Sequence, residues 1–305
     1  MPAQLLIYEA VVPLSFARHR DCSVEAGANY AFSGNVNSVP LMAVEFPEAA
    51  AEYPIVFAGT GDNLMPAVIL GVRGNENLYV TKVGGWEASY IPAFVRRYPF
   101  VFSTSPDGER LILCIDEAFA GFNREGRGQR LYSDDGKPTP FVDNVLRFLQ
   151  EYQSQFLRTQ GFCRKVHEAN ILEPMQAQVE LETGARISLG GFNAVNRTKL
   201  KAVPGDKLAV LAQTDELELL YLHLQSMRNF TRIKDRLVAA EGDRMQQAAA
   251  AEEAPSPGPE PAVAAAEPAS APDPAVAEAA PVAPEGDGGK SSPSGGRGAR
   301  RAAAE

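Results

Sequence analysis

The sequence predicts an α+β protein with one folded domain, residues 1–238, followed by a disordered tail, residues 239–305. Up to about residue 115, short β-branched and apolar runs alternate with glycine and proline, which is typical of antiparallel strands joined by turns. After residue 140, apolar residues recur at spacings of three and four, which indicates helices. Beyond residue 238, aromatic and branched aliphatic residues nearly disappear. We therefore expect a mainly antiparallel, β-rich first half and a helix-rich second half.

The first half contains several short apolar runs that predict strands: residues 5–12, 40–44, 55–57, 67–70, 77–81, 101–105 and 110–115. Residues 45–53 include three consecutive alanines and precede Pro54, so they predict a short helix. Ser105-Pro-Asp-Gly108 separates the last two runs. Asp-Gly between two β-rich segments predicts a hairpin.

The second half predicts two helices on either side of a hairpin. Residues 141–159 carry one apolar face, and Gly161 is expected to end that helix. Residues 177–181 and 186–189 are expected to pair around a turn at Glu182-Thr-Gly184. The last helix is expected to be capped by Thr214 and to run to about Leu237. Its apolar stripe consists of Leu217, Leu220, Tyr221, Leu224 and Met227.

The tail explains most of the net charge of −9, because it carries 11 acidic and 5 basic residues. Ten of the 23 prolines also lie there, and so little apolar mass cannot offset the entropy of ordering. The folded part is only mildly acidic. A nucleic-acid-binding protein would instead show a basic face, so this class is not expected.

The compartment is predicted from the cysteines and the N-terminus. Cys22, Cys114 and Cys163 form no disulfide framework, and Cys114 lies in an apolar run that predicts burial. The N-terminus lacks the basic region of a signal peptide, and no stretch of about 18 apolar residues occurs. We therefore expect a soluble, cytoplasmic protein without a membrane span.

Common catalytic signatures are missing from the sequence: it has no dinucleotide fingerprint, no phosphate-binding loop before a helix and no Gly-x-Ser-x-Gly elbow. One local pattern resembles a metal site. His19-Arg-Asp21 supplies two of the three ligands of a facial non-haem iron site, and His167 or His223 would have to provide the third. The alternative interpretation is a polar turn in which Asp21 bonds nearby backbone groups.

The densest motif runs from Gly84 to Phe100 and contains the only tryptophan. Its candidate partner-binding residues are Trp86, Tyr90, Arg96, Arg97 and Tyr98. A short helix is expected over residues 92–98, since proline is tolerated in a first turn and Pro99 must stop the helix. Two interpretations compete. In one, Trp86 and Phe94 fill the core while the arginines satisfy internal acids; in the other, the aromatic and arginine surface binds a partner.

The chain resembles the SapC family of bacterial proteins, named after a surface-layer-associated gene product. The resemblance covers roughly residues 5–237 and depends mainly on Trp86-x-x-x-Tyr-Ile-Pro-Ala and Arg96-Arg-Tyr-Pro-Phe100. Further matching segments are the His19 region, Val39-Pro-Leu41 with Glu45, Tyr53-Pro-Ile-Val-Phe57, Leu70-Gly-Val72, Asn77-Leu-Tyr79, Leu131-Tyr132, Gly136-Lys-Pro-Thr139 and Leu224-Gln-Ser-Met-Arg-Asn229. The resemblance implies an accessory role around surface-layer or envelope systems, with no settled activity.

Our sequence-based hypothesis is a non-enzymatic accessory or binding protein without a cofactor, whose partner is a protein or an envelope component. The alternative is an enzyme, in its sharpest form a non-haem metal-dependent oxygenase that uses His19 and Asp21. The sequence does not indicate an oligomeric state.

Overall fold

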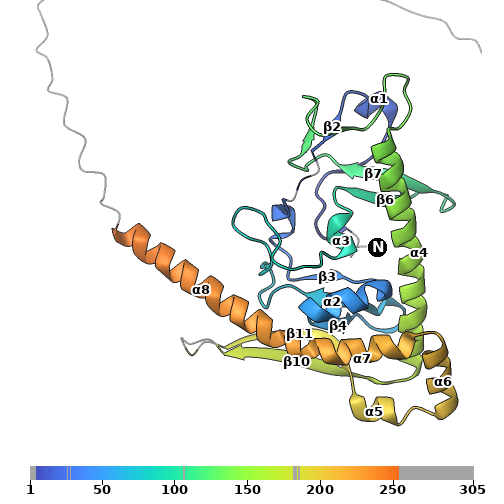
Figure 1. Ribbon diagram of the computed structural model, residues 1–305, viewed down its shortest axis with the longest axis vertical. Helices are drawn as coiled ribbons and strands as arrows, with labels where there is room; N and C mark the ends of the chain where they lie inside the picture. Colours follow the sequence, from blue (N-terminus) through green and yellow to red (C-terminus); the bar gives the residue numbers. More distant parts are fainter. Residues whose placement is uncertain are drawn as a thin grey trace, which may run out of the picture. The chain divides into compact units, whose positions relative to one another are not determined.

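In the residues that the structure describes, a computed structural model shows three antiparallel sheets and a set of helices (Figure 1). The structure describes residues 5–25, 27, 29–105, 107–180, 184 and 186–253. These residues belong to one compact unit, Met1–Ala254. Most strands lie in the first half and the long helices in the second, so the predicted α+β fold class is confirmed. Of the predicted disordered tail, residues 239–305, residues 239–253 are helical, and the part from residue 254 on lies outside the described residues.

The central sheet has five strands in the order β10-β11-β4-β5-β3, and every pair is antiparallel. Its strands are β3 (Ser38–Pro40), β4 (Ile55–Ala58), β5 (Met65–Ile69), β10 (Leu172–Glu180) and β11 (Arg186–Val195). Ile55 and Phe57 enter the main core, whereas Val56 enters a smaller apolar cluster. Because alternate residues of a strand point to opposite faces, both faces of β4 are buried. That burial explains why β4 reads as a continuous apolar run in the sequence.

Two three-stranded sheets lie beside a second apolar cluster. One has the order β1-β7-β6 and the other the order β8-β2-β9. Their strands are β1 (Val11–Pro13), β6 (Phe100–Thr104), β7 (Leu111–Asp116), β2 (Ser23–Val24), β8 (Phe122–Asn123) and β9 (Gln129–Arg130). Phe100 pairs with Ile115 and Thr104 with Leu111, which confirms the predicted hairpin. Pro106 of its turn lies outside the described residues.

Helix α4 (Pro140–Glu168) connects the two cores (Figure 1). Val142 and Leu149 pack in the second cluster, and Phe162 packs in the main core. The predicted end at Gly161 is wrong, because the helix continues through this glycine. Glycine costs about 1 kcal/mol relative to alanine in a helix. Burying a side chain such as that of Phe162 contributes about 1.5–3 kcal/mol, which outweighs the cost.

The C-terminal helices depart from the predicted single helix. They are α5 (Arg197–Lys201), α6 (Gly205–Gln213), α7 (Glu216–Ser226), the 3-10 turn η5 (Met227–Asn229) and α8 (Phe230–Glu253). Asp215, not Thr214, is the N-cap residue of α7, and Thr214 ends α6 instead. The 3-10 turn lies where Asn229 donates hydrogen bonds to the carbonyls of Ala50 and Tyr53, at 2.8 and 3.0 Å. Tertiary hydrogen bonds of this kind cannot be read from periodicity.

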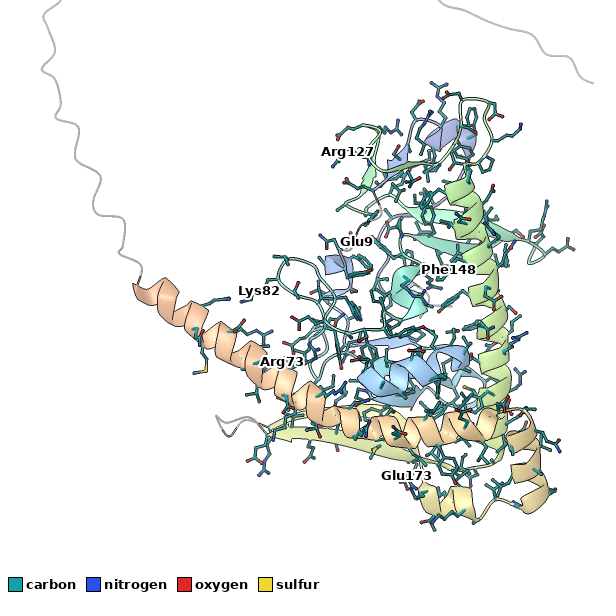
Figure 2. All side chains as sticks on the ribbon, viewed as in Figure 1. Glu9, Arg73, Lys82, Arg127, Phe148 and Glu173 are labelled. Carbon is teal, nitrogen blue, oxygen red and sulfur yellow. The ribbon has the colours of Figure 1, made fainter. Side chains whose placement is uncertain are left out.

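Helix α8 runs to Glu253, so the predicted end near Leu237 is wrong. Beyond Val238, α8 forms ion pairs with the first half of the chain. Arg73 Nη1 lies 2.8 Å from Glu241 Oε1, and Lys82 Nζ lies 3.1 Å from Asp243 Oδ2; Figure 2 labels both cations near α8. The helix also continues across residue 238. The domain boundary that the sequence predicts at this residue remains a prediction.

Three predicted strands in the first half are wrong in part. Residues 5–12 contribute only the start of β1. In the 40–44 run, only Pro40 belongs to β3, and the run ends in the 3-10 helix η3 (Ala43–Glu45). Residues 77–81 form a loop with one isolated bridge, between Val80 and Trp86. Ile7, Leu41 and Tyr79 of these segments enter the core, whereas Leu5, Leu6 and Val44 are exposed. An apolar run by itself does not specify strand pairing.

The remaining short helices fit the predictions more closely. The expected helix over residues 45–53 is α2 (Phe46–Glu52), and the one over residues 92–98 is α3 (Ala93–Arg96). Unpredicted are α1 (Phe16–His19), η2 (Ala31–Ser33) and η4 (Gly61–Asn63). The predicted β10–β11 hairpin is confirmed and is longer than expected, although of its predicted turn only Gly184 is described. Within the described residues, no helix is both long and apolar enough to cross a bilayer.

His223 joins α7 to the central sheet. Its Nδ1 donates to the Ile55 carbonyl at 2.8 Å, and its Nε2 accepts from the Val195 amide at 3.0 Å. The ring is fully buried, and this burial lowers the pKa of His223 from 6.5 to about 4. The neutral tautomer is therefore required, because a protonated ring could not accept from Val195.

We expect His223 to make stability depend on pH in acid. The unfolded chain binds more protons than the folded one between the folded and unfolded pKa values, about 4 and 6.5. The contribution is therefore complete above pH 6.5 and is lost as the pH falls towards 4. His223→Gln keeps one donor and one acceptor, and should reduce the loss of unfolding free energy between pH 7 and pH 4.5 by roughly 2–3 kcal/mol. Urea denaturation at both pH values measures it, with His167→Gln, an exposed position on α4, as the control. Equal pH profiles for the two variants would contradict the assignment.

Candidate functional site

The predicted motif lies in the loop that precedes α3 and continues into β6. Its first turn depends on Gly84, which has a φ of +84°. A Cβ at this position would lie 2.2 Å from Asn29 Oδ1. The Gly84 carbonyl accepts a hydrogen bond from the Tyr30 amide at 2.7 Å. Only glycine allows both this backbone conformation and this close approach.

Trp86 connects this loop to the core. Its Nε1 donates to the Tyr53 hydroxyl at 2.8 Å, and that hydroxyl donates to the Tyr90 carbonyl. The indole stacks on Tyr79, with ring centres 6.3 Å apart, and meets Tyr30 edge-on at 5.7 Å. Trp86 is half-buried and its indole N–H already has a partner. These contacts agree with the interpretation of Trp86 as a structural anchor.

Glu45 is a buried carboxylate that orders the segment around α3. It accepts hydrogen bonds from the Met42 amide at 2.8 Å, the Tyr90 hydroxyl at 2.7 Å and the Ala93 amide at 2.7 Å. Ala93 begins α3, where backbone N–H groups lack partners within the helix. Burial and, next, the negative charge of Glu45 raise the pKa of Tyr90. The Tyr90 hydroxyl therefore remains a donor at neutral pH.

Asp116 has the same role at the other end of the motif. Its carboxylate accepts from the backbone amides of Glu9, Ala10 and Ala118 at 2.8, 2.9 and 3.0 Å. The Tyr98 hydroxyl bonds the same carboxylate, and the pKa of Tyr98 is raised by burial first and by this charge second. Two buried acids thus receive their hydrogen bonds from backbone amides and tyrosines.

Arg97 is buried, with 4% of its surface exposed. Its guanidinium carbon lies 4.3 Å from the Phe94 ring centre, 4.8 Å from that of Tyr152 and 5.6 Å from that of Tyr8. Cation–π attraction of this kind is strengthened by removal from water. Phe94 is fully buried, as the structural interpretation expects. Arg97 therefore joins α3 to α4 and to the N-terminal segment.

Arg96 is exposed and lies beside an apolar surface. Its Nε donates to the Ile91 carbonyl at 2.9 Å, and its guanidinium carbon lies 5.5 Å from the Phe148 ring centre and 5.7 Å from that of Tyr90. Among the residues that the structure describes, it has no acidic partner. Its side chain is therefore held in place while its charge stays unneutralised.

An open cavity of about 310 Å³ lies between the α3–β6 segment and α4. We call it the Arg96 hollow, and it is lined by Arg96, Arg97, Tyr98, Pro99, Phe100, Phe141, Asn144, Val145 and Phe148. Figure 2 labels Phe148 on the side of α4 that faces α3. No acidic side chain belongs to this lining.

The hollow brings together three of the five predicted binding residues: Arg96, Arg97 and Tyr98. Trp86 and Tyr90 do not line it, although Tyr90 contacts Arg96. The residues that α4 contributes were not predicted as site residues. Their spacing of three and four was visible in the sequence, but it gave no sign that this part of the apolar face meets a hollow instead of the core.

The structure places His19 and Asp21 in separate polar contacts. The buried His19 ring lies with Nε2 3.1 Å from Glu117 Oε1 and with Nδ1 3.1 Å from Ser15 backbone atoms. Asp21 is exposed and pairs with Arg20 at 2.9 Å. In the part of the chain that the structure describes, no three His, Cys, Asp or Glu residues are grouped to hold a metal ion. His223 forms hydrogen bonds with strands of the central sheet, and His167 is exposed on α4.

Comparison with known proteins gives one match. A protein-family model described as SapC matches residues 14–233. No curated protein and no solved structure matches the chain. The matched range includes the whole lining of the Arg96 hollow.

We expect Glu45→Gln to destabilise the fold strongly. The amide keeps the size of the side chain, but it replaces one acceptor with a donor that faces other donors. Hydrogen bonds to a charged group contribute about 1.5–3 kcal/mol each, so a loss of roughly 2–4 kcal/mol of unfolding free energy follows. Urea denaturation at pH 7 measures it, and Glu48→Gln, an exposed position on α2, is the control. A Glu45 variant as stable as the control would show that the three hydrogen bonds do not order the segment.

Proposed function

We propose, because the chain belongs to the SapC family, that it is a non-enzymatic accessory protein that binds a protein partner of the bacterial surface layer or envelope. The link to the surface layer follows the family resemblance. A cytoplasmic location is part of the proposal, and the three unpaired, buried cysteines support it, since reduced thiols are usual in that compartment.

One observation carries the proposal: a fixed arginine without an acidic partner among the described residues stands at the edge of an apolar hollow. Arg96 is oriented by the Ile91 carbonyl and by the Phe148 ring. Such an arginine loses little side-chain freedom when a partner binds, so more of its interaction contributes to affinity. Arginine and aromatic residues are also the types enriched at the energetic centres of interfaces.

The lining of the hollow favours binding over catalysis. It contains two arginines, one asparagine and apolar or aromatic residues, without histidine, cysteine, serine or a carboxylate. Tyr98 is the remaining titratable group, and its raised pKa keeps it protonated at neutral pH. Covalent and acid–base catalysis both need a group whose pKa is matched to that task.

We expect a photo-crosslinking amino acid in the hollow to capture a partner in cells. p-Benzoylphenylalanine in place of Val145 should form a discrete crosslinked species, because Val145 lines the hollow. The same amino acid in place of Leu157, which is exposed on α4 outside the hollow, should not. When Arg96→Glu is added to the variant that carries p-benzoylphenylalanine at position 145, the reversed charge should reduce the yield of the crosslinked species at least fivefold. Mass spectrometry of the crosslinked species measures the yield and identifies the partner.

Arg158→Glu, a matched change on the exposed surface of α4, should leave the yield unchanged. Equal crosslinking from the two positions, or equal loss in both charge variants, would contradict the assignment of the hollow as the binding surface.

A further inference from the structure

The floor of the Arg96 hollow is a strip of apolar side chains. Phe141, Val145 and Phe148 follow one another on α4 at spacings of four and three, so they share one face of the helix. Phe100, at the start of β6, adds a fourth apolar side chain. Phe141, Val145 and Phe148 are all half-buried. The strip therefore offers apolar surface that a partner's side chain can cover.

Arg96 supplies the exposed charge on the rim of the hollow. Arg97 also belongs to the lining but is buried, and no acidic side chain belongs to it. The Arg96 Nε is taken by the Ile91 carbonyl, and its Nη2 makes only a long contact, 3.4 Å, with the Tyr90 hydroxyl. The terminal nitrogens of Arg96 thus remain the donors for an incoming group. Guanidinium groups recognise carboxylates through such paired N–H donors.

Asn144 supplies a neutral polar group on the same rim. Its side chain is exposed, and its Oδ1 accepts a hydrogen bond from Arg147. The Nδ2 of this amide is then the group turned to other partners, and it is a donor. A donor beside an apolar strip suits a peptide carbonyl. Together, the hollow offers an arginine that can bind a carboxylate, an apolar floor and an N–H donor for a peptide carbonyl.

The size and openness of the hollow decide between ligand classes. Its volume of about 310 Å³ is at the lower end of the range for small-molecule pockets, and it opens to solvent. A long acyl chain would not be enclosed there. A nucleic acid would need a much longer basic surface than two arginines provide. A short peptide segment that lies across the opening needs only one or two side chains to enter.

Resting on the proposed function, we infer that the Arg96 hollow takes a peptide segment of a partner protein that places a carboxylate side chain next to a large apolar one. The carboxylate binds the terminal nitrogens of Arg96. The apolar side chain covers Phe141, Val145 and Phe148, and Asn144 donates to a backbone carbonyl of the segment.

A peptide titration of the full chain tests this ligand class. The probe is acetyl-Glu-Leu-Glu-Phe-amide, followed by amide chemical shifts. We expect saturable shifts confined to α4 residues 141–148 and the α3–β6 segment. Acetyl-Gln-Leu-Gln-Phe-amide should bind at least fivefold more weakly, and acetyl-Glu-Ala-Glu-Ala-amide likewise. The glutamine-containing peptide lacks the charge, and the alanine-containing peptide lacks the large apolar side chains.

The arginine variants separate specific recognition from general attraction. Arg96→Gln should weaken the acidic peptide about tenfold, which is the effect of losing about 1.4 kcal/mol, and should leave the neutral peptide unchanged. Arg96→Lys should recover only part of the affinity, because an ammonium group lacks the planar pair of donors. Arg158→Gln on the exposed surface of α4 should have no effect. Equal weakening by Arg96→Gln and Arg158→Gln would overturn the proposal in favour of nonspecific charge attraction.

The two proposals fail in different ways. Crosslinking at Val145 that depends on Arg96, together with no saturable shifts from the acidic peptide, would overturn the ligand class and leave the binding function intact. Saturable binding of the neutral peptide as tight as that of the acidic one would also overturn the ligand class. Absence of both the crosslink and the shifts would overturn the binding function as well.

Discussion

The hydrogen bonds to the buried carboxylate of Glu45 organise the part of the molecule on which the candidate site depends. Glu45 lies in η3, far in sequence from the groups it holds, and it binds the Tyr90 hydroxyl and the first amide of α3. Burying an unpaired carboxylate would cost several kcal/mol. The loop before α3 therefore adopts a conformation that places these donors next to Glu45. The loop conformation in turn fixes where α3 begins. Arg96 and Arg97 follow within that single turn, and their directions are set by the same constraint.

Helix α4 forms the second side of the Arg96 hollow, and it packs against both apolar cores. Its first turns pack against the small sheets and its last turns against the central sheet. Between them the helix passes α3, where Arg97 lies on Tyr152 and Arg96 lies over Phe148. The Arg96 hollow lies beside the first turns of α4, with apolar residues of α4 on one side and the arginines on the other.

The aromatic and arginine motif combines the two interpretations that its sequence allowed. Phe94 and Arg97 are buried and Trp86 is half-buried against the core, whereas Arg96 faces solvent with its charge unneutralised by any described acid. The buried acids Glu45 and Asp116 accept from Tyr90, Tyr98 and backbone amides, and not from Arg96 as the structural interpretation required. Adjacent residues of a short helix point in different directions, so neighbouring arginines can have separate roles. The motif is therefore mainly a scaffold that presents one exposed cation at the edge of the hollow.

The sequence by itself determined the α+β class, the β6–β7 and β10–β11 hairpins, the start of α4 and the family, because these follow from local periodicity, turn residues and a specific motif. It also singled out Arg96, Arg97 and Tyr98, which line the Arg96 hollow. Only the tertiary structure decided that α4 continues past Gly161, that residues 77–81 form a loop, and that Phe141, Asn144, Val145 and Phe148 complete the hollow. The physical reason is that an apolar pattern specifies which residues leave water but not which surface covers them. That choice depends on contacts between segments far apart in the chain, such as Glu45 with Ala93 and Arg96 with Phe148.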